Sequence, residues 1–223
     1  MRDKWISEGL IGHAPIHLPY LISRGVGEGC KVAFNSWKPN PNITCPKFKA
    51  NFGSQGERIK DCIIIPVTSP RGEIIGIEAR KFNADGSKNV HQYRTLSSQW
   101  NPFLLGAEEA FKALWNQGDL WIVEGIFDKV ALDRVIPSCD AVASTLRAGM
   151  DSITMDMIAR YYSPASTIFI CYDNDETGRK KSNWLHKEMT KRGIRSVIWK
   201  YRGKDPNEVW TQGGDIALRR MFT

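Results

Sequence analysis

The feature that most constrains the fold of this sequence is a regular alternation of strands and helices that begins near residue 119. Short apolar runs of the buried-strand type are each followed by a stretch with helical spacing of apolar residues. The expected strands are residues 120–123, 141–144, 167–172 and 196–199, and the expected helices are 126–135, 153–162, 178–191 and 215–221. This alternation predicts a mostly parallel sheet covered by helices on both faces.

The sequence before residue 117 has a different pattern. Two β-branched runs, 61–67 and 73–80, flank a Pro-Arg-Gly turn and predict a β-hairpin. A short helix is expected to close at Gly25, and another helix is expected over 104–116. The expected connections are 38–56, which is rich in Pro and Gly, and the polar stretch 83–101. We therefore expect an α/β fold, α+β overall, with a smaller mixed N-terminal lobe (1–117) and a C-terminal α/β domain (118–223).

Composition narrows the class of protein. The 223 residues are 42% hydrophobic, which argues against intrinsic disorder, and their longest apolar run is far shorter than a membrane span. The five cysteines are widely spaced without a CxxC pair, so we expect reduced thiols, no zinc and a cytoplasmic location. The net charge of +7 suits a polyanionic partner such as nucleic acid, although charge alone is a weak indicator.

Acidic side chains follow several of the expected strands. Glu124 comes directly after one strand, Asp173 and Asp175 after another, and Asp205 lies a few residues beyond the last; Asp128 is one helical turn after Glu124. Ligands of open α/β sheets bind beyond the carboxyl ends of the strands, so these carboxylates are expected to gather there. Crowded carboxylates repel one another unless a cation joins them, and Mg²⁺ prefers oxygen ligands. The pattern predicts a metal site for phosphoryl transfer, while helix N-capping remains the alternative for each acid alone.

A basic segment surrounds these acids in the sequence. Residues 179–204 contain ten Lys or Arg and one acid, Glu188. A solvated helix face is one interpretation, and a surface for a phosphate backbone is the other. Most of the tryptophans Trp184, Trp199 and Trp210 are expected in the core, and one exposed ring would serve to stack a base.

Ordered motifs connect this pattern to a known family. Residues 123–132, 143–145 and 173–179 resemble the TOPRIM domain of primases, topoisomerases and nucleases. Residues 20–26, the hairpin from Ile64 to Arg80, and Gly203-Lys204-Asp205-Pro206-Asn207-Glu208 resemble further parts of the catalytic core of bacterial-type (DnaG-like) DNA primases. The resemblance covers roughly residues 18–220.

This resemblance implies a TOPRIM-type sheet and an enzyme that makes short RNA primers on single-stranded DNA from ribonucleoside triphosphates, with Mg²⁺ or Mn²⁺. By analogy Glu124, Asp173 and Asp175 are the central catalytic and metal-binding acids, and Asp128 and Asp205 support the metals or the nucleotide. The expected nucleotide- and DNA-binding residues are Arg80, Arg94, Arg147, Arg179, Lys180 and Lys204. The implied partners are a replicative helicase and a zinc-binding module, in cis or in trans, with no membrane.

Departures from the family pattern leave alternatives open. Asn207 stands in place of the second acid of the "DPD" motif, Gln92 in place of an expected lysine, and Ser144-Thr145-Leu146-Arg147 in place of the usual Gly-Thr turn. No zinc-binding module precedes the core, so a fragment, a partner-dependent primase and a divergent phage or plasmid version all remain possible. The rival functions are a TOPRIM metal-dependent nuclease and a non-catalytic single-strand-binding module of a helicase–primase complex.

Overall fold

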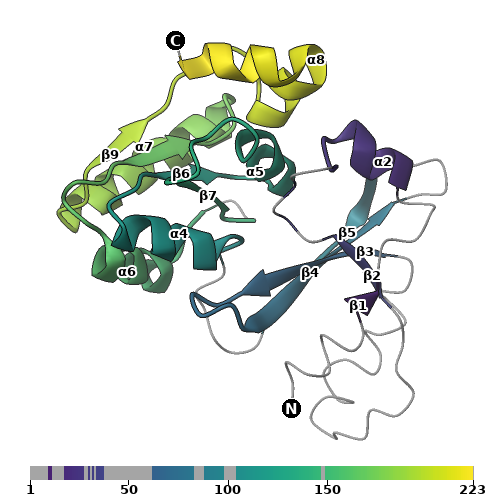
Figure 1. Cartoon of the computed structure of the whole chain (residues 1–223), viewed down its shortest axis with the longest axis horizontal. Helices are drawn as coiled ribbons and strands as arrows, with labels where there is room; N and C mark the ends of the chain where they lie inside the picture. Colours follow the sequence, from purple (N-terminus) through teal and green to yellow (C-terminus); the bar gives the residue numbers. More distant parts are fainter. Residues whose placement is uncertain are drawn as a thin grey trace, which may run out of the picture.

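Two β-sheets organise the molecule (Figure 1). The computed structural model describes residues 10–11, 18–27, 30, 32, 34–37, 62–82, 88–97, 104–146 and 149–222. One sheet is antiparallel and built from the first half of the chain, and the other is parallel and built from the second half.

The parallel sheet has the strand order β7-β6-β8-β9. Its strands are β6 (Leu120–Val123), β7 (Ala141–Ser144), β8 (Ile168–Cys171) and β9 (Ser196–Ile198). Residues of β6 and β7 are buried throughout, as expected for parallel strands covered on both faces. Because β6 lies between β7 and β8, the segments that follow β6 and β8 emerge side by side at one edge.

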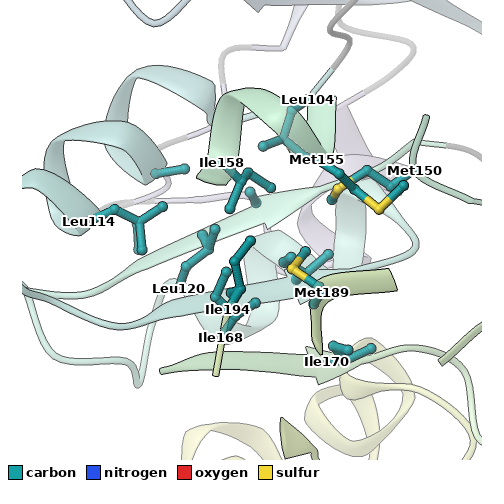
Figure 2. Packing of buried hydrophobic residues seen from close by; sticks show 14 of the residues in the cluster. Leu104, Leu114, Leu120, Met150, Met155, Ile158, Ile168, Ile170, Met189 and Ile194 are labelled. Atoms are coloured by element: carbon teal, nitrogen blue, oxygen red, sulfur yellow. The ribbon is translucent and has the colours of Figure 1, made fainter. Parts of the chain in front are cut away.

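Helices cover both faces of this sheet. On one face α4 (Ala107–Trp115), α6 (Ser152–Tyr161) and α7 (Glu176–Lys191) pack against alternate strand residues such as Leu120 and Ile168, together with Met155 and Met189 (Figure 2). On the other face α5 (Ile126–Leu132), α8 (Pro206–Arg219) and the 3₁₀ turn η2 (Arg220–Phe222) pack against Trp121 and Val123. Successive side chains of a strand point to opposite faces of the sheet, so each strand contributes residues to the hydrophobic core on both faces.

The antiparallel sheet has the order β1-β2-β3-β4-β5. It consists of β1 (Leu10–Ile11), β2 (Asn35–Trp37), β3 (Cys62–Thr68), β4 (Ile74–Phe82) and β5 (Lys88–Ser97). The helix α2 (Leu18–Ser23) lies beside it and ends as predicted, with Gly25 in the left-handed region at φ 86°. A Cβ at Gly25 would also press on the ring of Trp210, so this turn requires glycine.

The two sheets share a hydrophobic core through α5. Residues of α2 and β3, among them Leu21 and Ile63, pack in one cluster with Ile126, Phe127 and Val130 of α5. The Phe127 ring stacks on Phe34 and contacts Tyr20 edge-on. The first helix of the parallel domain therefore joins the two lobes through apolar contact.

The structure confirms the predicted fold class and corrects two elements. The stretch 83–101 was predicted as a connection, but residues 88–97 form β5, paired with β4 from Gly76↔Ser97 to Arg80↔Tyr93. The sequence of β5 is mostly polar, without the alternating apolar residues that identify a half-buried strand, so its strand character is not evident from periodicity. The predicted connection 38–56 and Cys45 lie outside the described residues.

The first part of α8 was not predicted. A helical stretch begins at Pro206, because Asp205 caps it and proline fits the first helical position, and the predicted helix from residue 215 corresponds to the part of α8 that follows Gly214. Gly214, with φ 64°, interrupts the helical geometry and masks the periodicity of the first half. Within the described part of the chain, no helix combines the length and apolarity that crossing a membrane requires.

Candidate active site

The predicted acids lie at the carboxyl edge of the parallel sheet. Val123 of β6 is in register with Cys171 of β8, so Glu124 and Asp173 follow neighbouring strands. The sequence argument from strand ends therefore describes the backbone positions correctly. The side chains of these acids have individual partners.

Glu124 is held from two sides. Its backbone carbonyl accepts a hydrogen bond from Ser144 Oγ (3.0 Å), at the end of β7. Its carboxylate Oε1 accepts from Lys181 Nζ of α7 at 2.7 Å. The Glu124 carboxylate at the carboxyl end of β6 is therefore paired with the Lys181 ammonium.

Asp173 is half-buried and surrounded by negative charge. Burial, followed by repulsion from Glu124 and Asp205, raises its pKa to about 6, against a lowering contribution from Lys204. Gly178 packs so closely on the Asp173 carbonyl oxygen that any Cβ there would collide with it. The glycine of this motif therefore lets the start of α7 approach the Asp173 backbone.

Asp175 and Asp205 act as helix N-caps. Asp175 Oδ1 accepts from the Gly178 backbone N–H at 2.7 Å, and Asp205 Oδ1 accepts from the Glu208 N–H at 2.7 Å. Capping uses one oxygen of each carboxylate, which leaves the other oxygen for a further ligand. The capping alternative therefore holds for both residues without removing them from the candidate site.

Asp128 is the most buried of the five acids, at 7% exposure. Its Oδ2 accepts from the Gly125 N–H (3.1 Å), and its Oδ1 accepts from the Asn207 N–H (3.1 Å). Burial, and then the charge of Asp205, raise its pKa well above the usual aspartate range. Asp128 therefore links α5 to α8, and its predicted support of a metal stays a prediction.

The donor chemistry at this edge suits a hard divalent cation. Five carboxyl groups influence one another: the pKa values of Asp173 and Asp128 are raised first by burial and then by repulsion from neighbouring carboxylates, and a cation would relieve that repulsion. In the described residues, no three acidic, His or Cys side chains already converge as metal ligands. Binding an ion therefore requires carboxylates such as that of Glu124 to turn from their present partners.

The predicted basic residues have diverse positions. Lys204, Arg179 and Lys180 are exposed; Arg179 donates to the Asn174 carbonyl (2.9 Å), and Lys180 pairs with Glu176 (2.6 Å). Arg80 is largely buried, pairs with Glu78 at 2.9 Å and lies over the Phe127 ring at 5.6 Å. Arg94 lies in β5, whose side chains are not described, and Arg147 is outside the described residues.

Two cationic residues have roles that the sequence argument missed. The Arg24 guanidinium lies 4.6 Å from the Phe127 ring centroid, at the junction of the two lobes. Lys181 was counted only within the basic segment, although the spacing Gly178, Lys181, Leu185 (i, i+3, i+7) indicates the buried face of α7. That spacing was the available signal for an inward-pointing lysine.

Asn207 is a link between the two lobes. Its side chain is buried, and its amide NH₂ donates to the backbone carbonyls of Arg24 (3.1 Å) and Phe127 (3.3 Å). Its own backbone N–H donates to Asp128. A carboxylate has no N–H to donate, so the asparagine at this position is matched to its two carbonyl partners.

We expect Asn207→Asp to destabilise the fold by about 2 kcal/mol, because it removes two donors and buries a second carboxylate beside Asp128. Urea denaturation followed by circular dichroism measures this loss. The matched control is Asn183→Asp on the exposed face of α7, expected to change stability by less than about 0.5 kcal/mol. Equal stability of the two variants would contradict the assigned role of Asn207.

Comparisons with known proteins show which proteins this chain resembles. Residues 121–210 match a family model described as Toprim-like. A curated DNA primase from Listeria monocytogenes is 25% identical over 228 residues, covering 92% of this chain and 36% of that protein. The chain is similar to bacterial DNA primases. It spans about a third of the length of the curated primase just described.

Solved primases share the fold. The Aquifex aeolicus primase, solved with its zinc-binding and RNA polymerase domains, has a TM-score of 0.71 and 20% identity, covering 93% of this chain and 55% of that one. A DnaG primase catalytic domain bound to single-stranded DNA has a TM-score of 0.70 and 18% identity, and the match covers 94% of this chain and 72% of that one. The expected resemblance to the DnaG-like catalytic core is therefore confirmed at the level of fold.

Proposed function

We propose that this chain is the catalytic core of a DNA primase, a nucleotidyltransferase that joins ribonucleotides into short primers on single-stranded DNA. The observation that carries the proposal is the position of Glu124 and Asp173 after neighbouring parallel strands within a primase-like fold. Similarity to DNA primases over 92% of the chain supports the same reaction. The bacterial cytoplasm is the proposed compartment.

The proposed metal ligands are the carboxylates of Glu124, Asp173 and Asp175, with Asp128 and Asp205 in support. These side chains would hold a Mg²⁺ or Mn²⁺ ion, which would supply a lower pKa at the attacking 3′-hydroxyl and charge neutralisation for the nucleoside triphosphate. Each of the two N-cap aspartates retains one carboxylate oxygen for this role.

Basic residues position phosphates in this proposal. Lys204 and Arg179 are exposed beside the acids, and their ammonium and guanidinium groups suit the triphosphate or the template backbone. Arg80, Arg94, Arg147 and Lys180 complete the proposed set. We also propose that residues 1–117 form the N-terminal lobe of the primase core, whose last helix α4 packs on the parallel sheet, and that residues 118–223 form the TOPRIM domain with its C-terminal helix.

The proposed partners follow from the relatives. The Aquifex primase structure includes a zinc-binding domain, and this chain covers 55% of it. We propose that a zinc-binding module and a replicative helicase act with this core, in cis or in trans.

A primer-synthesis assay tests the proposed function. The purified chain is incubated with single-stranded DNA, labelled ribonucleotides and Mg²⁺ or Mn²⁺, and products are separated by size. We expect short RNA that requires template, ribonucleotides and divalent metal together. Metal-dependent degradation of the DNA without ribonucleotides would replace the proposal with the nuclease alternative. Salt-sensitive DNA binding without either product, even with a zinc module and helicase added, would favour a non-catalytic module.

A further inference from the structure

Lys181 is placed differently from the other lysine at the start of α7. Its Nζ lies 2.7 Å from Glu124 Oε1, and the two side chains are only 18% and 24% exposed. The neighbouring Lys180 pairs with Glu176 on the outer surface, where both side chains are more than three-quarters exposed. One ion pair is therefore partly buried at the sheet edge, and the other is solvated.

The position of Lys181 is built into α7. Gly178 brings the start of the helix against the Asp173 backbone, and Leu185 anchors the next turns in the core. Lys181 lies between these two residues on the inward face, three residues from one and four from the other. The packing of α7 on the sheet therefore fixes the position of the Lys181 ammonium beside Glu124.

We propose that Lys181 is a positioning residue that orients Glu124 before a divalent ion binds and then competes with that ion for the carboxylate. The inference rests on the proposed function, since it concerns the same acids. A fixed ammonium at ion-pair distance repels a divalent cation at the same carboxylate, and partial burial weakens the screening of that repulsion. Lys181 thus raises the metal concentration at which the centre fills.

The contact also explains the present arrangement of the acids. Glu124 is turned toward Lys181, while Asp175 and Asp205 are turned toward helix N–H groups. Filling the site exchanges the Lys181 contact for a metal contact at Glu124. The exchange needs no change in the fold, because a lysine side chain has rotatable bonds and can move toward solvent.

Direct metal binding tests this inference without relying on activity. The free Mn²⁺ signal in electron paramagnetic resonance is followed while the full chain is titrated. We expect Lys181→Met, which keeps the apolar part of the side chain, to lower the Kd for Mn²⁺ about tenfold. Lys180→Met removes the same charge from the solvated pair and is expected to change the Kd less than twofold. Lys181→Arg retains the charge and is expected to stay within twofold of the original chain.

The outcomes separate this inference from the proposed function. If the chain binds Mn²⁺ and Glu124→Gln weakens binding, but Lys181→Met leaves the Kd unchanged or raises it, the inference about Lys181 is wrong while the metal site stands. If neither the original chain nor Lys181→Met binds Mn²⁺, the metal site and the inference fail together. Should Lys181→Met not fold, Lys181→Gln serves as the second charge-removing variant with the same expected tightening.

Discussion

Replacing Asp173 with asparagine is expected to lower primer synthesis by about 10³-fold. Asp173 is the proposed ligand at the end of β8, and a neutral amide is a far poorer donor to a divalent ion than a carboxylate. Loss of about 4 kcal/mol of transition-state stabilisation corresponds to that factor. DNA binding is expected to be retained or slightly tighter, since a negative charge is removed. Product formation and filter binding on the same preparations measure the two quantities.

The stability of Asp173→Asn separates lost chemistry from lost folding. Asp173 has a folded pKa of about 6, above the ordinary aspartate pKa of about 3.8, because burial and then repulsion from neighbouring acids disfavour the carboxylate. The charge therefore destabilises the metal-free fold increasingly as pH rises from about 4 to above 6. After allowance for solvent screening, Asp173→Asn should be about 1 kcal/mol more stable at pH 7.5 and no more stable at pH 4.

The control for this variant is Asp156→Asn. Asp156 lies on the exposed face of α6, 60% exposed, and pairs with Arg192 away from the sheet edge. Its replacement should leave synthesis within twofold. Near-normal synthesis by Asp173→Asn would rule out Asp173 as a metal ligand, whatever the stability and DNA binding of the variant.

The sequence predicted the backbone of the site well, because periodicity and strand ends are local properties. Leu120–Val123 and Ile168–Cys171 are recognisable as buried strands, so the positions of Glu124 and Asp173 follow from parallel pairing. The edge strand β5 was missed because its polar residues carry little periodic signal. Strands could thus be predicted from the sequence where burial on both faces of the sheet produces a continuous apolar run.

Side-chain partners were less predictable, because they depend on contacts between distant residues. Lys181 meets Glu124 across 57 positions, and Asn207 meets Phe127 across 80. Helical spacing was an unused signal that Lys181 lies on the inward face of α7, and only the packing of that helix on the sheet identifies its partner. Asn207 was interpreted only as the loss of the second acid of the "DPD" motif, whereas its amide contacts show that it joins the two lobes.

The largest stability effect is expected from Asp133→Ala. Lys129 Nζ lies 2.9 Å from Asp133 Oδ2 and donates to the Val142 carbonyl at 2.7 Å, and both charged side chains are at most 3% exposed. Removing Asp133 strands a buried ammonium between α5 and β7, which costs about 3–5 kcal/mol. Urea denaturation measures the loss, which would leave a domain of this size close to unfolding at 37 °C.

A double variant tests whether the loss comes from the stranded charge. Lys129→Met with Asp133→Leu replaces the pair by apolar side chains of similar length, and such replacements of buried pairs are often neutral. We expect the double variant to recover at least half of the stability lost in Asp133→Ala. A loss below about 1 kcal/mol in Asp133→Ala, or no recovery in the double variant, would contradict this account. Because α5 also carries Phe127 and Asp128, the pair supports the helix on which the lobe junction and the candidate site depend.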